Sequence, residues 1–177
     1  MVAEISKGQR HHVRSWYGLA GEIDVENRLL HLVKVGSVPL HHPPLVNLLI
    51  RRGLPLDDRL RLSYLHEFGH FQTLPLAAVH LFWMARRGLS KKRSIWKWLL
   101  WLGLLGVAHE AMWEILSEGY VVFHERSAYW STYKKFNNPF LPLFWGAIGA
   151  LGIGLSLWVM SEIQRYPPDK EHEHERK

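Results

Sequence analysis

The chain has 177 residues, a formal net charge of +6 and no cysteine. This length is enough for one domain with its own core and is short for two. Without cysteine there is neither a disulfide framework nor a thiolate metal site, so any metal has to be held by histidines and carboxylates. No base-reading or phosphate-binding motif accompanies the positive charge, and we therefore expect no nucleic-acid partner.

Apolar residues are distributed very unevenly along the chain. They concentrate between Leu62 and Met160, whereas the segments before and after are polar and charged. Basic residues cluster at Arg86–Arg87 and Lys91–Arg93, between two apolar segments, where lipid headgroups favour cations. This partition predicts an integral membrane protein in contact with a lipid bilayer. Its orientation stays unresolved, because the basic segment favours the cytoplasmic side while no signal peptide is expected before Trp16 to export the N-terminal part.

Residues 1–56 are predicted to form a polar N-terminal segment. Between Trp16 and Val35, apolar and polar residues alternate between glycines, which predicts one or two short strands arranged as a hairpin. His41 and His42 stand beside prolines and are assigned to a solvated loop, since neighbouring side chains diverge. At the other end, residues 162–177 are predicted to form a charged, solvated tail.

The central segment, residues 57–161, is predicted to form a membrane-embedded helical core. A first helix begins at about Asp58 and contains Pro75, which should kink it. A second helix begins near Ile95, and the third apolar run, Phe140–Met160, carries no charge and is the clearest transmembrane span. The predicted fold class is therefore mainly α: a membrane helical bundle of about three apolar helices with a short N-terminal β-containing segment.

Small residues recur at every fourth position of the last apolar run, at Gly146, Ala150 and Gly154. Such a stripe lets the backbone of another helix approach closely. We expect a helix to pack on this face, which makes it the candidate surface for a homo-oligomer.

The strongest functional signal is a His-Glu-x-x-His pattern within Leu65–His70. At helical pitch His66 and His70 lie one turn apart on one face, so both imidazoles can reach a single metal ion. Glu67 is then turned toward a water on that metal, which is the layout of a zinc hydrolase. The competing interpretation is chance, because the chain holds 12 histidines and 16 acidic residues. The apolar helical context favours the site, since charged groups are costly there.

A catalytic zinc ion usually has three protein ligands and a fourth position for water, so the two histidines require a partner. The block Leu116–Arg126, which contains Ser-Glu-Gly, resembles the Asn-Glu-Gly block of the gluzincins, particularly the aminopeptidase branch of the thermolysin-like clan. The resemblance implies that His66, His70 and Glu118 are zinc ligands and that Glu67 is the general base.

Ser117 stands where the aminopeptidases have asparagine. The long stretch of chain between His70 and Glu118 is more similar to the ligand spacing of membrane-embedded gluzincins such as the CAAX-type prenyl proteases. An antiparallel hairpin that turns near Lys91–Lys92 also accounts for this separation. His70 lies about 20 residues before that turn and Glu118 about 26 after it, so a rise of roughly 1.5 Å per residue brings both to similar depth.

Two further glutamates, Glu114 and Glu125, lie on nearly the same helical face as Glu118. Either side chain could orient a ligand histidine, and Glu114 is the alternative third ligand. His80 and His109 are interpreted as buried, hydrogen-bonded histidines rather than as ligands.

These features predict a membrane-bound zinc-dependent endopeptidase that cleaves a peptide or protein substrate, with Glu67 taking the proton of the attacking water. Two alternatives stay open: a non-catalytic metal-binding or metal-transporting membrane protein, and a scaffold without metal. A site-2-type protease is disfavoured, since its Asp-Gly ligand motif is absent from the sequence. The donor that stabilises the oxyanion is not assigned among Tyr120, His124, Arg126, Tyr129 and Tyr133.

Overall fold

The computed structural model describes residues 10–25, 29–33, 38–39, 50–89, 94–136 and 138–164. The predicted His41–His42 loop, the Lys91–Lys92 turn and the charged tail beyond residue 164 lie outside these residues. Within them the chain is mainly helical with one small sheet, which confirms the mainly α class and the N-terminal β-containing segment.

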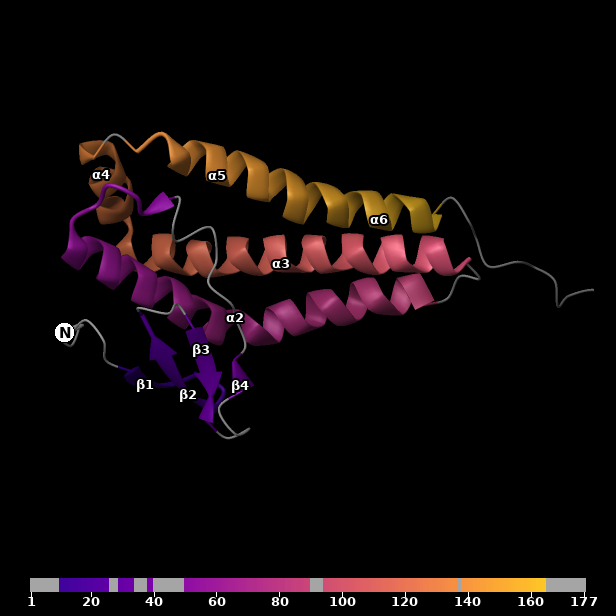
Figure 1. Ribbon diagram of the computed structural model, residues 1–177, viewed down its shortest axis with the longest axis horizontal. Helices are drawn as coiled ribbons and strands as arrows, with labels where there is room; N and C mark the ends of the chain where they lie inside the picture. Colours follow the sequence, from indigo (N-terminus) through magenta and orange to yellow (C-terminus); the bar gives the residue numbers. More distant parts are fainter. Residues whose placement is uncertain are drawn as a thin grey trace, which may run out of the picture.

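Long helices make up most of the molecule, and the strands come first in the chain (Figure 1). The helical elements are α2 (Leu56–Leu89), α3 (Ile95–Glu125), α4 (Ser127–Lys135), α5 (Phe140–Gly149), the π-helix η2 (Ala150–Gly154) and α6 (Leu155–Gln164). The strands are β1 (Arg10–Arg14), β2 (Ala20–Asp24), β3 (Leu29–Leu32) and β4 (Val38–Pro39).

The four strands form an antiparallel sheet in the order β1-β2-β3-β4. The predicted hairpin between Trp16 and Val35 corresponds to β2 and β3, which pair antiparallel. The prediction did not include β1. Exposed and partly buried side chains alternate along this strand, and the two partly buried ones are His11 and Val13. Because one of these is a polar residue, the alternation carries little hydrophobic signal.

The sheet packs against the first half of α2. Phe71 of α2 is fully buried among Ile23 and Val25 of the sheet region. A Cβ atom at Gly21 would lie 3.2 Å from the Phe71 ring, so the absence of a side chain at Gly21 lets β2 approach the helix closely. This contact fixes the N-terminal segment beside the His-Glu-x-x-His turn.

Helix α2 changes direction near its middle (Figure 1), and Pro75 lies inside it as expected. Proline has no N–H group, so the Phe71 carbonyl loses its usual helical donor. The Tyr17 hydroxyl donates to this carbonyl instead, and the Trp16 indole N–H donates to the next carbonyl, that of Gln72, at 3.0 Å. The kink therefore creates the acceptors that anchor the N-terminal segment.

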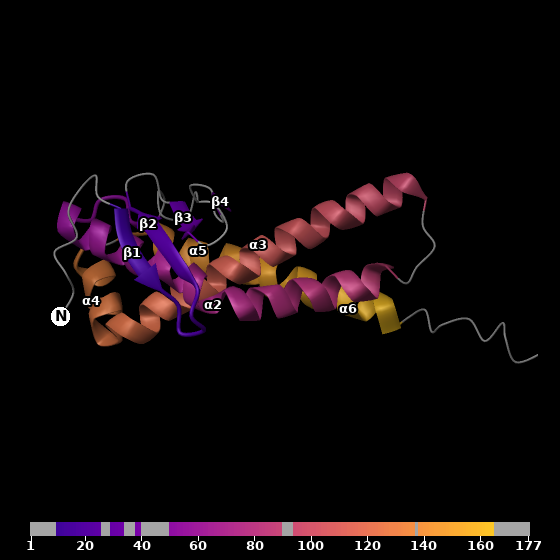
Figure 2. The same cartoon turned by 90° about the horizontal axis from the view of Figure 1, so that it is seen from below.

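Helices α2 and α3 run antiparallel and pack side by side (Figures 1 and 2). They approach each other closely at Gly69, where a Cβ atom would lie 2.7 Å from the backbone oxygen of Ser117. Toward Leu89 and Ile95 the two helices separate, as Figure 2 shows. The tight contact is thus at the level of the histidine motif, and it determines which residues of α3 face that motif.

Helices α5 and α6 continue into each other through η2 and lie along α3 (Figure 1). Gly152 makes this packing close, since a Cβ atom there would lie 3.0 Å from the backbone nitrogen of Met112. By contrast, Gly146 and Gly154 have open space beside them and Ala150 is exposed. The small-residue stripe therefore faces no helix among the described residues, and the homo-oligomer through it stays a prediction.

In the part of the chain that the structure describes, two helices are long and apolar enough to cross a membrane: Ile95–Glu125 and Phe140–Val159. Three such helices were expected, and α2 does not meet the same test of length and composition. The reason is that α2 is of mixed composition. Its first half carries Asp57, Asp58 and the histidine motif, and its second half exposes apolar side chains such as Val79 and Phe82.

Candidate metal centre

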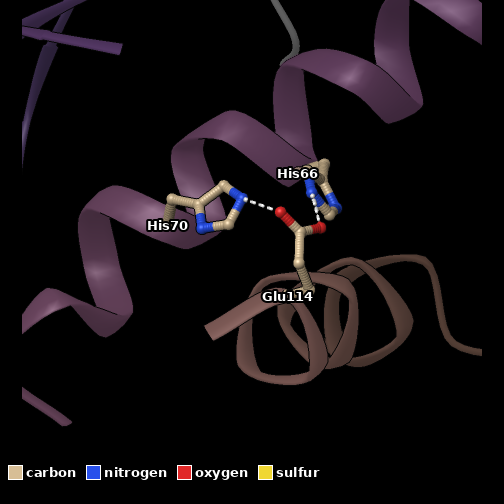
Figure 3. A group of neighbouring side chains, drawn as sticks. All are labelled: His66, His70 and Glu114. Atoms are coloured by element: carbon tan, nitrogen blue, oxygen red, sulfur yellow. Dashed lines mark hydrogen bonds and ion pairs between the residues drawn. The ribbon is translucent and has the colours of Figure 1, made fainter. Parts of the chain in front are cut away.

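The two histidines of the motif lie together and fully buried on the face of α2 that meets α3. The centroids of the His66 and His70 rings are 4.8 Å apart. Glu114 of α3 reaches up between the rings (Figure 3). Its two carboxylate oxygens lie 3.1 Å from His66 Nε2 and 3.4 Å from His70 Nε2. One carboxylate thus faces the same nitrogen of both imidazoles.

These distances fit a shared metal ion. In a tetrahedral zinc site with bonds of about 2.0–2.1 Å, neighbouring ligand atoms lie about 3.3 Å apart. His66, His70 and Glu114 form the one group of metal-binding side chains found among the described residues, with ligand atoms within 4.8 Å of one another. Two imidazoles and one carboxylate are the donor set of many hydrolytic zinc sites. The geometry therefore suits a metal, although it does not select zinc over other ions that imidazole binds.

Glu118 lies on the opposite side of His66. Its Oε2 atom is 2.7 Å from His66 Nδ1, and since a carboxylate only accepts, the ring donates its Nδ1–H. The Nε2 atom then presents a lone pair toward Glu114. A lone pair this close to a carboxylate is stable only with a cation between them, either a metal ion or a second proton on the ring.

The structure therefore brings both candidate acids to the motif but in different places. Glu114, the alternative from the sequence, faces both imidazoles, whereas Glu118, the residue implied by the gluzincin resemblance, holds the far nitrogen of one. A carboxylate in the latter position fixes the tautomer and the orientation of a ligand histidine.

A buried arginine completes the surroundings of Glu118. The Arg51 side chain is fully buried and its Nη2 atom donates to Glu118 Oε2 at 2.8 Å. The Nη2 atom also donates to the Leu62 carbonyl at 3.1 Å, and the Nη1 atom donates to the Tyr133 hydroxyl at 3.3 Å. Burial lowers the pKa of Arg51, but the Glu118 carboxylate and the neighbouring tyrosines raise it above the ordinary value, so the group stays charged.

Sequence reasoning missed Arg51, because it stands beside Arg52 after the apolar run Leu48–Ile50 and no periodic pattern marks it as buried. The loop that carries it is held from the far side by Asn138. The Asn138 side-chain amide donates to the carbonyls of Ile50 and Arg52, the residues on either side of Arg51. The Asn138-Pro139 break before α5 therefore also positions the arginine.

Two of the five candidate oxyanion donors belong to this network. The Tyr129 hydroxyl donates to Glu118 at 2.8 Å, and the Tyr133 hydroxyl accepts from Arg51. Burial and the nearby Glu118 carboxylate raise the pKa of Tyr129, and burial is also the main cause of the raised pKa of Tyr133, so both remain phenols. Tyr120 and His124 instead contact each other, with ring centroids 4.2 Å apart.

The remaining predicted residues lie around the centre without joining it. Glu67 is fully buried, and at helical pitch it lies between the His70 face of α2 and the Phe71 face that packs on the sheet, outside the group formed by His66, His70 and Glu114. Glu125 is the last residue of α3 and pairs with Arg61, so it does not belong to the group around His66 and His70. Ser117, at the asparagine position of the gluzincin block, donates to the Trp113 carbonyl of its own helix.

Replacing Glu118 by Gln should weaken zinc binding without abolishing it. The amide still accepts from His66 but removes the negative charge behind the ring, and such changes next to a ligand typically cost about 10- to 100-fold in metal affinity. Competition with a chromophoric chelator measures the effect. Complete loss of binding in Glu118→Gln, together with normal binding in Glu114→Gln, would instead make Glu118 the ligand.

No protein-family model, no curated protein and no solved structure matches this chain. The case for a metal centre therefore depends on its own geometry.

Proposed function

We propose that this chain is a membrane-bound, zinc-dependent endopeptidase in which His66, His70 and Glu114 hold the metal and Glu67 is the general base. One observation carries the proposal: the Nε2 atoms of both motif histidines face a single carboxylate in a fully buried site. A buried carboxylate and two buried imidazoles on apolar helices are costly unless they are used. Metal-assisted hydrolysis is the chemistry for which this donor set and the adjoining Glu67 are most often assembled.

Zinc at these ligands would supply Lewis acidity toward a carbonyl oxygen and would acidify a water molecule. The residues of the chain have separate tasks. Glu118 and Arg51 keep the His66 ring in the tautomer whose Nε2 faces Glu114. Glu67, one residue after His66, takes the proton of the attacking water and later delivers it to the leaving nitrogen. The surrounding apolar side chains keep other water away.

We place the protein in a lipid bilayer as a bundle of three helical rods: α2, α3, and the α5–α6 rod. Two of the rods are long and apolar enough to span. Large apolar side chains also lie on the outside of α3, of the α5–α6 rod and of the second half of α2. A bilayer would cover this surface. These side chains include Val79, Phe82, Leu99, Leu100, Leu143 and Leu157.

A second candidate function is metal binding or transport without catalysis. The complete burial of His66, Glu67 and His70 favours it, because a peptide must reach the metal whereas a bare ion needs only a narrow path. The two candidates differ in what they require of Glu67. A hydrolase needs its carboxylate as a base, while a carrier has no use for proton transfer at this position.

Removal of the metal tests the proposal directly. The full chain, purified in detergent, is incubated with a pool of quenched fluorescent peptides and with casein. Treatment with 1,10-phenanthroline should abolish hydrolysis, and Zn²⁺ but not Mg²⁺ should restore it, because imidazole ligands bind zinc far better than magnesium. Hydrolysis that continues without metal, or the lack of any hydrolysis by zinc-loaded protein, would contradict the assignment.

A further inference from the structure

An exposed aromatic side chain stands in the turn between β1 and β2. Trp16 is 75% exposed, whereas the other exposed side chains of residues 10–25 are polar, namely Arg10, His12 and Arg14. The turn lies beside the middle of α2, as Figure 2 shows. None of the chemistry assigned to the metal centre uses this turn.

Hydrogen bonds hold the turn against α2. The Trp16 backbone N–H donates to Gln72 Oε1 at 3.0 Å, and the Trp16 indole N–H donates to the Gln72 carbonyl at 3.0 Å. The Gln72 side-chain amide donates in return to the Arg14 carbonyl at 3.4 Å. The polar atom of the indole is thus satisfied within the protein, while the rest of the ring stays outside in a fixed position.

The exposed apolar surface of α2 and α3 has a sharp edge close to this turn. On α2, residues 60–75 expose no large apolar side chain, and such side chains begin at Leu76. On α3 they extend from the start of the helix to Val107, and the next exposed side chain is that of Glu110.

The edge lies at the same depth on both helices. The two helices run antiparallel, and Gly69 lies against Ser117. Leu76 is seven residues after Gly69, and Glu110 is seven residues before Ser117. Equal steps along antiparallel helices cover equal distances, so the change from polar to apolar surface occurs at one level, as it does at the edge of a bilayer.

Trp16 stands at the polar side of this edge. Its hydrogen-bond partner Gln72 precedes Leu76 by one helical turn, about 5.4 Å. Tryptophan is enriched at membrane–water interfaces, where its ring lies at the level of the lipid headgroups. The exposed cation of Arg14, two residues earlier, complements the negative charge of lipid phosphates.

The apolar surface reaches further along the third rod. Gly152 packs against Met112, and the exposed Leu143 lies nine residues before Gly152, level with about residue 121 of α3. The edge is therefore oblique to the helices. This corresponds to a bundle that is tilted in the bilayer, and transmembrane helices are tilted by about 20° on average.

We propose that the turn at Trp16 is a lipid-binding anchor that fixes the edge of the bilayer on α2 near Gln72. The Trp16 ring lies between lipid headgroups and acyl chains, and the Arg14 guanidinium lies among the lipid phosphates. The inference rests on the bilayer placement proposed above and is independent of hydrolysis.

The anchor also defines how the metal centre lies relative to the bilayer. His70 is six residues before Leu76, and Glu114 is four residues after Glu110, so both lie about 6–9 Å outside the apolar edge at 1.5 Å per residue. The centre is then on the water side of the edge. Under the proposed function, its substrates are chain segments beside the bilayer rather than segments within it.

Quenching of a site-specific fluorophore by brominated lipids tests the anchor. The chain has no cysteine, so one introduced cysteine is its only thiol. The full chain is labelled with bimane at Trp16→Cys and placed in phosphatidylcholine nanodiscs, with bromines either near the headgroup or at the middle of the acyl chains. The label should lose more fluorescence to the shallow bromines. Arg14→Cys, which keeps the indole, should show the same order and covers the case in which Trp16→Cys does not fold.

Two further labels calibrate the depth. Arg10→Cys, at the start of β1, should show no quenching, and Phe82→Cys, 68% exposed on α2, should lose more fluorescence to the deep bromines. If Phe82→Cys is quenched while the labels at Trp16 and Arg14 behave like that at Arg10, the turn does not touch lipid and the inference is wrong. Preferential quenching of the Trp16→Cys label by deep bromines would also contradict it. If Phe82→Cys is not quenched either, the bilayer placement itself fails, whatever the peptidase activity.

Discussion

Replacing Glu67 by Gln is expected to lower peptide hydrolysis by about 100- to 10,000-fold while the zinc content stays at the wild-type value. The amide has nearly the same size as the carboxylate but cannot take a proton from water. Glu67 is not among the side chains grouped around the metal position, so the ligands keep their geometry. The measurement is the initial rate on the quenched peptides, together with the zinc content of the same preparation.

Glu110→Gln is the matched control for this experiment, because Glu110 is an exposed glutamate of α3, one turn before Glu114. It should keep both activity and zinc. Wild-type turnover in Glu67→Gln would show that this side chain is not the base. Retention of zinc with no hydrolysis in either the wild type or the variant would favour the metal-carrier candidate.

Replacing Arg51 by Met is expected to lower the free energy of unfolding by about 3–5 kcal/mol. Arg51 and Glu118 are both fully buried, and their closest atoms are 2.8 Å apart. Removing the cation leaves a buried carboxylate that keeps, among the described residues, the Tyr129 hydroxyl and the His66 ring as donors. Denaturant titration of the purified protein in mixed micelles measures the change.

The double variant Arg51→Met/Glu118→Gln separates the cost of the stranded charge from the worth of the pair. It should recover a large part of the lost stability, since no uncompensated charge remains. Arg61→Met is the control, because Arg61 pairs with Asp58 and Glu125 in a partly exposed position and should cost no more than about 1 kcal/mol for each pair. Equal losses in Arg51→Met and Arg61→Met would mean that the buried pair is not structurally important.

The parts of the fold that the sequence predicts are those with a local cause. The start of α3 at Ile95 and the helix from Phe140 onward follow from apolar runs, of which only the second is free of charged residues up to Met160. The pairing of His66 with His70 follows from helical pitch alone, and their ring centroids are 4.8 Å apart. Each of these features depends on residues that are near one another in the chain.

The remaining features depend on how distant elements meet. Glu114 and Glu118 are one turn apart on the same face, so only the depth at which α3 lies along α2 decides which of them faces both imidazoles. At the observed depth Gly69 of α2 lies against Ser117 of α3, a close contact that no periodicity reveals. Burial of Arg51 likewise depends on α4 and on Asn138, both far away in the sequence.

The most direct test of the account is the zinc content of purified Glu114→Ala beside that of the wild type and of Glu110→Ala. Our account predicts that Glu114→Ala loses one zinc equivalent per chain and all hydrolysis, because two imidazoles alone hold the ion poorly. Glu110→Ala should match the wild type in both. If Glu114→Ala keeps the full zinc content, the carboxylate between His66 and His70 is not a ligand and the proposed centre is wrong.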